Sequence, residues 1–296
     1  MNRRTPIFSP ARIWTMGWNT LTELTRLKVF YFLLIFALLV IGNSLFLAQL
    51  SFGEKSQMLK DVSLGAMSIF TSLIAILATA MLLPKDLEER TTFTILAKPV
   101  PRYEYLAGKL LGILLLLAIS VIVMSGLFLV VLWIQEHGAI ADARAALDAH
   151  QLSTEDFNST VASVQRATFT SNLLPGILII FIKSALLSSL TLMISTFASS
   201  AIFTMLMSIA IYFIGHLQAT AREYWLSGLD PHWWTRPALA VVALLFPDLQ
   251  AFSLTDEVVA GTAIPLGLFL QTASLGFFYV GIYYLLACFL FSNREL

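Results

Sequence analysis

The chain has 296 residues and a formal net charge of zero; 58% of its residues are hydrophobic and only 12% are charged. A mean hydropathy of +0.81 excludes an ordinary soluble globular domain, and the balanced charge excludes a polyanion binder such as a nucleic-acid-binding protein. Most of the chain is therefore expected to lie in lipid, where backbone polar groups must pair within each segment. The apolar runs are long and do not alternate, so they predict spanning helices rather than barrel strands.

The N-terminal segment, residues 1–28, contains an amphipathic stretch at residues 11–28. As a helix, this stretch would separate large apolar side chains from charged ones. The two sets are Ile13, Trp14, Trp18, Leu21 and Leu24 on the apolar face and Arg12, Glu23, Arg26 and Lys28 facing water. Such a helix lies in the membrane interface with its tryptophans at headgroup depth. Two interpretations remain open: a positively charged anchor for the first span, or an elbow helix that packs against a later connector.

The remainder, residues 29–296, is predicted to form one transmembrane domain with six spanning helices. Each apolar run holds about the twenty residues that a bilayer requires. The runs are residues 29–50, 62–83, 109–133, 173–196, 201–218 and 265–291. No cleavable signal peptide is expected, because the first run begins only at Val29 and is too long for one.

Counts of lysine and arginine predict the orientation of these spans. The N-terminal segment, the connector between the second and third spans and the C-terminal tail carry 11 such residues. The opposite side carries six, together with twelve of the eighteen acidic residues. Because positive residues gather on the cytoplasmic side, both termini and the connector are predicted to be cytoplasmic. The expected location is the bacterial inner membrane, with several passes.

Two segments on the opposite side are too long to be simple turns. Residues 134–172 are polar and alanine-rich, which predicts one or two helices outside the membrane. Residues 219–264 contain aromatic residues typical of the membrane interface, namely Tyr224, Trp225, Trp233 and Trp234. Within this second segment, residues 237–254 are apolar but interrupted by Pro247 and Asp248. The interruption favours a re-entrant or surface-lying helix; a further span, which would move the C-terminus outside, is the alternative.

The connector, residues 84–102, belongs to a charge cluster between two apolar runs; residues 84–112 hold five basic and four acidic side chains. A short helix is predicted at residues 86–96, with acidic residues in its first turn that complement the helix dipole. These residues are Asp86, Glu88 and Glu89. Pro99 and Pro101 would end the helix.

The residues around and after these two prolines are assigned to the membrane surface or to helix packing. Lys98 and Arg102 are predicted to lie near anionic headgroups, and Tyr105 at the interface. Gly108 and Gly112 form a small-xxx-small pair, which allows the third span a close contact with a neighbouring helix. Taken alone, these features fit equally a solvated loop that only sets topology.

The pattern EERTTFTILAKPVPRYEYLAGKLLG, which begins at Glu88, resembles the connector after the second helix in permeases of the ABC-2 transporter family. It is most similar to the branch that includes NosY-like and gliding-associated permeases. The matching positions are Glu88, Glu89, Arg90, Thr91, Leu96, Ala97, Lys98, Pro99, Val100, Arg102, Gly108, Lys109 and Gly112. Residues 246–261 and 291–296 also resemble the family, so the resemblance covers essentially the whole chain. Pro101 and Asp248 depart from the common serine and asparagine.

This resemblance implies an all-α, six-helix membrane protein of the ABC-2 exporter type, with a coupling helix seated in a groove of a separate ATPase. The residues implied to contact the ATPase are Asp86, Glu88, Glu89, Arg90, Thr91 and Thr92. The implied partners are two copies of the ATPase, a second permease copy that is identical or a paralogue, and membrane lipid. A periplasmic partner is a further candidate, and no nucleic acid is expected.

Catalytic and cofactor motifs are missing from the sequence. There is no GxxxxGK[ST] phosphate loop, so ATP and Mg²⁺ are expected on the partner ATPase and no cofactor on this chain. There is no HExxH motif or paired His/Cys set, so no metal site is predicted and the chain is expected to be a non-catalytic subunit. The histidines are expected to be surface residues; they are His137, His150, His216 and His232. Cys288 is expected to be a packing residue.

Lys183 is the one clear charge inside a predicted span. Intramembrane charges usually face the protein interior or a cavity, so Lys183 is a candidate for the substrate path or the seam between permease copies. A lysine that reaches the nearer membrane surface is the alternative. Hydroxyl residues on the same helix favour contact with other helices. They are Ser184, Ser188, Ser189, Thr191, Ser195 and Thr196.

The function predicted from these features is a permease subunit that couples ATP hydrolysis by its partner to export. Two alternatives remain: a mechanotransmission subunit that acts on a periplasmic partner or on metalloenzyme maturation without moving a solute, and an ATP-independent carrier or channel. The sequence names neither the cargo nor the identity of the second permease copy.

Overall fold

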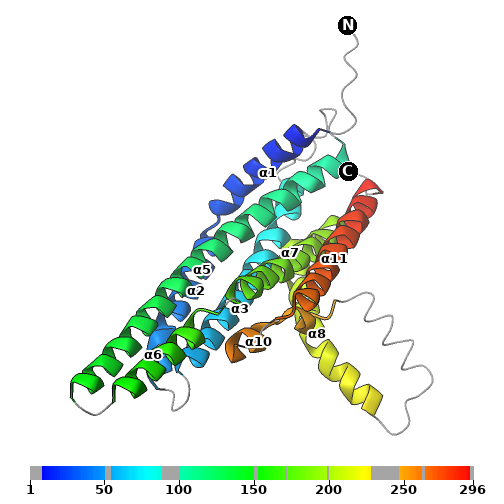
Figure 1. Ribbon diagram of the computed structural model, residues 1–296. Coiled ribbons are helices and arrows are strands. Elements are labelled where there is room, and N and C mark those ends of the chain that lie inside the picture. The colour runs from blue at the N-terminus through cyan, green and yellow to red at the C-terminus, as the bar shows by residue number, and fades with distance from the viewer. Residues whose placement is uncertain are drawn as a thin grey trace.

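The computed structural model describes residues 9–50, 55–88, 101–149, 153–170, 172–198, 200–227, 247–261 and 264–293. Over these residues the protein is helical and contains no strand. Six of the described helices are long and apolar enough to cross a membrane, which confirms the predicted all-α, multi-pass fold class. Figure 1 shows most of these helices running alongside one another, while the end of α8 diverges to one side and the α5–α6 hairpin extends to the other.

The candidate spans alternate in direction along the chain. They are α2 (Lys28–Gln49), α3 (Lys55–Glu88), α5 (Arg102–Asp148), α7 (Leu173–Phe197), α8 (Ala201–Ser227) and α11 (Leu266–Ser292). A buried cluster joins the last turns of α3, α7 and α11 to the first turns of α5. We call this end of the bundle the connector end, because α3 ends and α5 begins there, before and after residues 89–100.

Three helices are longer than their apolar runs: α3, α5 and α8, the last of which continues past Gln218 to Ser227. α3 continues through Pro84 as far as Glu88. The prediction of a separate helix beginning at Asp86 was therefore wrong at its start, because residues 86–88 continue a helix that is already formed. α5 begins directly after Pro101, whose ring fixes φ near the helical value and whose lack of an N–H costs no hydrogen bond at the start of a helix. It then runs for 47 residues, about 70 Å, well beyond a bilayer core of about 30 Å.

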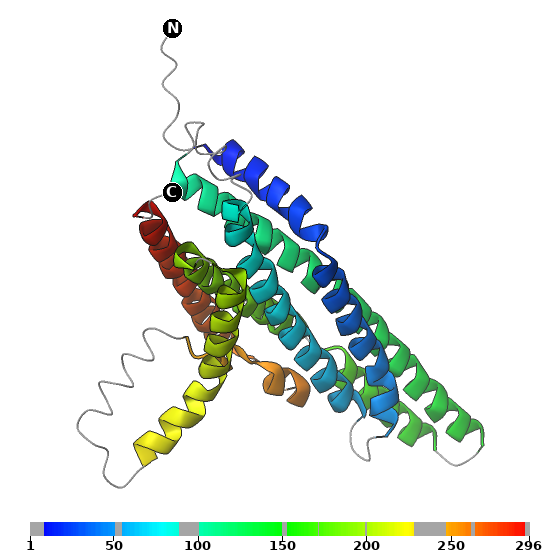
Figure 2. The same cartoon turned by 180° about the vertical axis from the view of Figure 1, so that it is seen from behind.

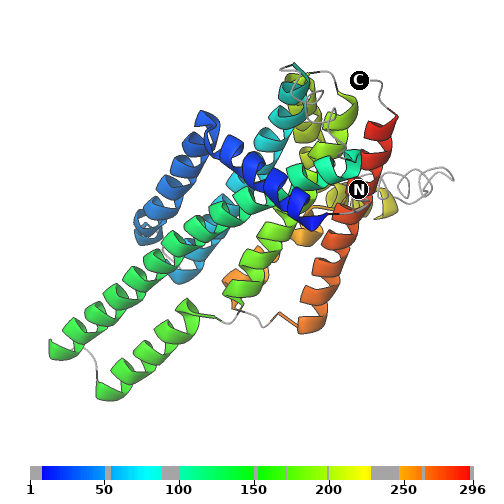
Figure 3. The same ribbon diagram turned by 90° about the horizontal axis from the view of Figure 1, so that it is seen from above.

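The far end of α5 forms a hairpin with α6 (Thr154–Thr168), so residues 134–148 and 154–168 are helical, in agreement with the helices predicted within residues 134–172. Ser153 caps α6, because its side-chain oxygen accepts a hydrogen bond from the Asp156 amide at 3.1 Å. Buried Lys60 of α3 donates to the carbonyl of Ala167 at 2.6 Å, at the negative end of the α6 dipole. Figure 3 shows the α5–α6 hairpin extending away from the other helices.

α7 is the central helix of the bundle. Eighteen of its 25 residues are buried, and it packs against α3, α5, α8 and α11. The outer helices instead expose large apolar side chains, as expected for surfaces that contact lipid. Examples on α2, α8 and α11 are Phe32, Ile202 and Leu285.

The segment before α11 folds back into the bundle. It contains a 3₁₀ turn, η1 (Gln250–Phe252), and a short helix, α10 (Thr255–Ala260). The Leu249 amide donates to the carbonyl of Gly215 in α8 at 3.1 Å. A Cβ at Gly276 of α11 would lie 3.0 Å from the ring of buried Phe252, so the segment packs closely between these helices. Most of the predicted re-entrant helix at residues 237–254 lies outside the described residues.

Candidate functional site

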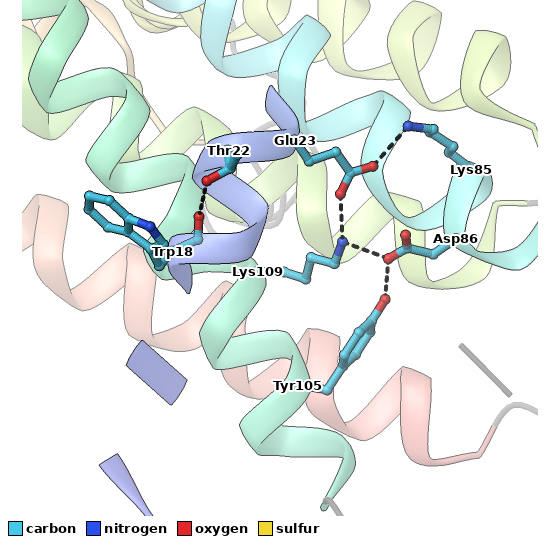
Figure 4. A network of polar contacts seen from close by, with 7 residues as sticks. All are labelled: Trp18, Thr22, Glu23, Lys85, Asp86, Tyr105 and Lys109. Carbon is cyan, nitrogen blue, oxygen red and sulfur yellow. Dashed lines mark hydrogen bonds and ion pairs between the residues drawn. The ribbon is translucent and has the colours of Figure 1, made fainter. Parts of the chain in front are cut away.

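A network of charged side chains gathers at the connector end of the bundle (Figure 4). Lys109 of α5 is the centre of the network: its Nζ lies 2.7 Å from Oδ2 of Asp86 in α3 and 3.4 Å from Oε2 of Glu23 in α1 (Pro10–Thr25). Lys85 of α3 lies 3.0 Å from the other Glu23 oxygen. The Tyr105 hydroxyl donates to Asp86. The network therefore joins α1, the end of α3 and the start of α5.

Burial makes two members of this network energetically important. The side chains of Lys109 and Asp86 are 7% and 8% exposed, whereas that of Lys85 is 39% exposed. Burial by itself raises the pKa of Glu23, but the positive charges of Lys109 and Lys85 more than offset this effect and lower the pKa overall. Glu23 is thus held in its charged form as a partner for both lysines.

A second ion pair fixes the start of α1 to α5. The carboxylate of Glu104, a fully buried residue, accepts a hydrogen bond from the Ser9 amide at 2.9 Å. It also lies 3.0 Å from Nε of Arg12. A carboxylate at the first turn of a helix satisfies a free amide and complements the helix dipole. α1 is therefore attached to α5 near both of its ends.

Between these two polar contacts, α1 and α5 approach each other through glycine. A Cβ at Gly108 would lie 2.5 Å from the Met16 Cβ, and one at Gly112 would lie 2.7 Å from the carbonyl oxygen of Gly17. The small-xxx-small pair thus lies where α5 makes a close contact, and the neighbour is α1. α1 therefore packs against α5, while Trp14 and Trp18 remain exposed on its other face.

The start of α5 is also tied to the end of α11. Nη1 of Arg102 donates to the carbonyls of Phe291 and Ser292 at 2.8 and 2.9 Å. These carbonyls belong to the last turn of α11, where a cation complements the helix dipole. The Tyr284 hydroxyl donates to the carbonyl of Tyr103 at 2.8 Å. We call the contacts that join α1, α3 and α11 to the first turns of α5 the connector hub.

The hub corrects three of the predicted roles. Asp86 was assigned to the ATPase contact, but it is buried against Lys109 and Tyr105. Tyr105 was assigned to the membrane interface, but it is only 1% exposed. Its hydroxyl can be buried because it donates a hydrogen bond to Asp86 inside the protein. Arg102 binds helix carbonyls rather than facing only the lipid surface.

The other predicted connector residues lie at or beyond the edge of the described chain. Glu88 is the last residue of α3. The remaining candidates lie outside the described residues; they are Glu89, Arg90, Thr91, Thr92, Lys98 and Pro99. Of the connector candidates, the hub therefore contains only those that lie on the helices flanking residues 89–100, namely Asp86, Arg102 and Tyr105.

Sequence reasoning missed several hub residues. Arg12 and Glu23 were expected to face water, and Glu104 received no role, yet all three form ion pairs. The partners lie 62 to 92 residues apart in the sequence, so no local spacing reveals them. The one available signal was the position of Glu104 and Lys109 inside a helix that also carries the glycine pair.

Lys183 belongs to a separate polar cluster between α3, α7 and α8. It is 3% exposed, and its Nζ donates to Oγ of Ser68 at 3.2 Å and lies 3.0 Å from Nε2 of His216. The Tyr212 carbonyl is 3.0 Å from Nδ1 of His216 and can only accept, so Nδ1 carries the hydrogen and Nε2 accepts from Lys183. Lys183 therefore faces the interior of one bundle rather than the membrane surface, and His216, which is partly buried, is its partner.

We expect Lys183→Met to lower the free energy of unfolding in detergent by about 1–3 kcal/mol, because the partly buried Ser68 hydroxyl and His216 ring nitrogen lose their donor. Lys55→Met, at an exposed position of the same bundle, is the matched control and should have no measurable effect. Denaturant titration followed by circular dichroism measures both. A loss for Lys183→Met no larger than for the control would show that the hydrogen bonds to Lys183 are not stabilising.

No cluster of three or more potential metal ligands occurs in the part of the chain that the structure describes. The strongest constellation in that part is the connector hub, which contains ion pairs and helix-end contacts. These groups hold helices together and can pass a displacement from one helix to another.

Together, the alternating apolar helices and the hub at one end define a multi-pass α-helical membrane protein. A profile of the family described as ABC-2 family transporter protein matches residues 26–219, more than half of the chain. The chain therefore belongs to the ABC-2 transporter family and is a membrane permease component. No curated protein matches it. The family implies association with an ABC ATPase.

Proposed function

We propose that this protein is the membrane-spanning subunit of an ABC exporter, in which ATP hydrolysis by a separate ATPase drives transport. The observation that carries the proposal is the connector hub: both ends of residues 89–100 are attached, through Asp86 and Lys109, to the same network. A force applied to the connector would therefore act on several helices at once. The sequence resembles ABC-2 permeases and is most similar to the NosY-like branch. In that family the connector is the part that the ATPase contacts.

The hub specifies how the displacement would spread. Movement of the α5 start would pull α1 through Glu104, α3 through Asp86 and α11 through Arg102. Buried, close-packed contacts transmit displacement because they do not deform continuously. The helices would thus tilt as a group when two ATPase subunits close.

The proposed orientation places the connector, α1 and the end of α11 in the cytoplasm. Its support is the excess of lysine and arginine in these segments. In this orientation an inner-membrane protein presents the connector to a cytoplasmic ATPase. ATP and Mg²⁺ would bind to that partner, and two permease copies, identical or paralogous, would complete the transporter.

The coupling role is tested by the double substitution Glu88→Lys and Glu89→Lys. We expect a lower yield of the permease–ATPase complex, or ATP hydrolysis that no longer responds to the permease, with normal membrane insertion. A single solvent-exposed ion pair at an interface contributes little to its stability, so the double change is required. Glu136→Lys with Asp142→Lys, on the far part of α5, is the control. Unchanged complex yield and ATPase response in the connector variant would refute the proposal.

The extended hairpin favours one second candidate, a subunit that acts mechanically on a periplasmic partner. α5 continues as a single helix from the connector hub to Asp148, so one rigid element joins the hub to the hairpin. A photo-crosslinking residue at exposed Glu155 would capture a periplasmic protein if this role is correct. Capture of no protein, together with ATPase activity stimulated by a solute, would favour export.

A further inference from the structure

α8 is held to the bundle through an interface that is largely polar. Its first part packs against α3 and α7, while its end diverges from the other helices (Figure 2). Only one of the residues that α8 buries between residues 201 and 218 is large and apolar. The buried residues are Thr204, Ser208, Ile211, Gly215 and Gln218. Large apolar side chains, such as Ile202 and Phe213, instead cover the exposed face, where they contact lipid.

This interface leaves buried polar atoms without hydrogen bonds. The Ser208 hydroxyl and the side-chain oxygen of Gln218 are buried and have no hydrogen-bond partner among the described residues. A buried polar group without a partner has lost its contact with water and gained nothing in return, so separation of the helices would relieve that cost. The packed position of α8 therefore depends on the other contacts across the interface.

Lys183 of α7 and His216 of α8 form a charged contact across this interface. The Lys183 Nζ donates to Nε2 of His216 at 3.0 Å, since Nδ1 of the ring donates to the Tyr212 carbonyl. Lys183 also donates to Ser68 of α3, so the contact joins all three helices. It requires a neutral His216 ring, because a proton on Nε2 would remove the acceptor and place a second positive charge beside the ammonium.

The groups around His216 act on its charge in opposite ways. Lys183 is the only charged residue of α7, α3 contributes the Ser68 hydroxyl, and the Tyr212 ring lies against His216 on α8. Asp248, in the segment before η1, is close enough for its negative charge to act on the His216 ring. His216 is thus subject to a cation that requires the neutral ring and to an anion that would stabilise the charged one.

We propose that Lys183 and His216 form a proton-responsive latch that holds α8 against α3 and α7. While His216 is neutral, it accepts the hydrogen bond from Lys183 and α8 stays packed. Uptake of a proton from solvent by Nε2 ends this contact and leaves two adjacent cations, so α8 moves away and water reaches Ser208. Because the proton and the contact exclude each other, a lower pH favours the separated position. More distant charges set the pH at which the latch opens, not the direction of the change.

Cysteine labelling of the purified full-length protein tests the latch. In a Cys288→Ala background, Ser208→Cys reports the buried face of α8, and Ala210→Cys, at an exposed position of the same helix, corrects for the effect of pH on thiol reactivity. The measured quantity is the N-ethylmaleimide labelling rate of Ser208→Cys divided by that of Ala210→Cys. We expect this ratio to rise about tenfold from about pH 8 to about pH 5.5, the factor that corresponds to the loss of one buried hydrogen bond.

Three further variants separate the latch from a general effect of acid. His216→Gln keeps an acceptor that does not titrate, so its ratio should stay low at both pH values. Lys183→Met removes the donor, so its ratio should be high at both. His137→Gln, which replaces an exposed histidine of the α5–α6 hairpin, is the matched control and should respond like the parent.

A parental ratio that does not change with pH would overturn the proposal. So would an equal rise in His216→Gln, or a response that His137→Gln abolishes as well. These measurements use neither transport nor an ATPase, so their failure leaves the proposed function intact.

Discussion

Replacing Gly112 by valine should detach α1 from α5 and lower the free energy of unfolding by about 1–3 kcal/mol. A Cβ at this position would lie 2.6 Å from the Thr20 Cβ and 2.7 Å from the carbonyl oxygen of Gly17. The second clash is with backbone, so no rotamer change relieves it, and the two helices must separate. Thermal unfolding in detergent measures the loss of stability, and trypsin cleavage at Arg26 measures the exposure of α1.

Gly126→Val is the control on the same helix. A Cβ at Gly126 would have no heavy atom within 4 Å, so this variant should keep parental stability and cleavage. Gly112→Ala should fall between the two valine variants, since it adds only the clashing carbon. Parental stability and slow cleavage in Gly112→Val would mean that the close approach of α1 and α5 does not hold in the membrane protein.

Replacing Lys109 by methionine should be the most damaging change within the charge network. It removes the ion-pair partner of Asp86, whose side chain is 8% exposed, and one of the two cations beside Glu23. Loss of one partner of a buried ion pair costs about 3–5 kcal/mol, because the remaining charge stays in a poorly solvated site. Denaturant unfolding of the purified protein gives the value directly.

Lys85→Met provides the comparison, because its side chain is 39% exposed and pairs with the same Glu23. A pair of this kind contributes about 0–1 kcal/mol. The double variant Lys109→Met and Asp86→Leu should recover part of the loss, which a double-mutant cycle quantifies as coupling between the two residues. Equal losses for Lys109→Met and Lys85→Met would show that burial does not set the strength of the network.

The predicted spans agree best with the structure where an apolar run ends at a helix end. α2, α7 and α11 begin and end within a residue or two of the predicted limits, because hydrophobic length alone determines these helices. The lengths of α3, α5 and α8 were underestimated. Beyond Trp133 the sequence turns polar but is rich in alanine, which favours helix. α5 therefore continues past the end of its apolar run as far as Asp148.

The connector hub could be predicted only in part. Gly108 and Gly112 indicated a close helix contact, but the sequence did not say which helix would fill it. The role of Asp86 was inferred from the local helix dipole, whereas its partner Lys109 lies 23 residues further along the chain and on another helix. A charge pattern shows which side chains need partners; three-dimensional packing decides which partners they find.

The length of α5 gives small rotations a large reach. Because the helix is continuous over 47 residues, pivoting it by about 5° around its first turn displaces its far tip by about 6 Å. Arg102, Glu104 and Lys109 all lie in the first two or three turns and fasten that part to neighbouring helices. α5 thus acts as a lever that pivots at its first turns. Sub-ångström shifts among the few ion pairs at that end become displacements of several ångströms at its far tip.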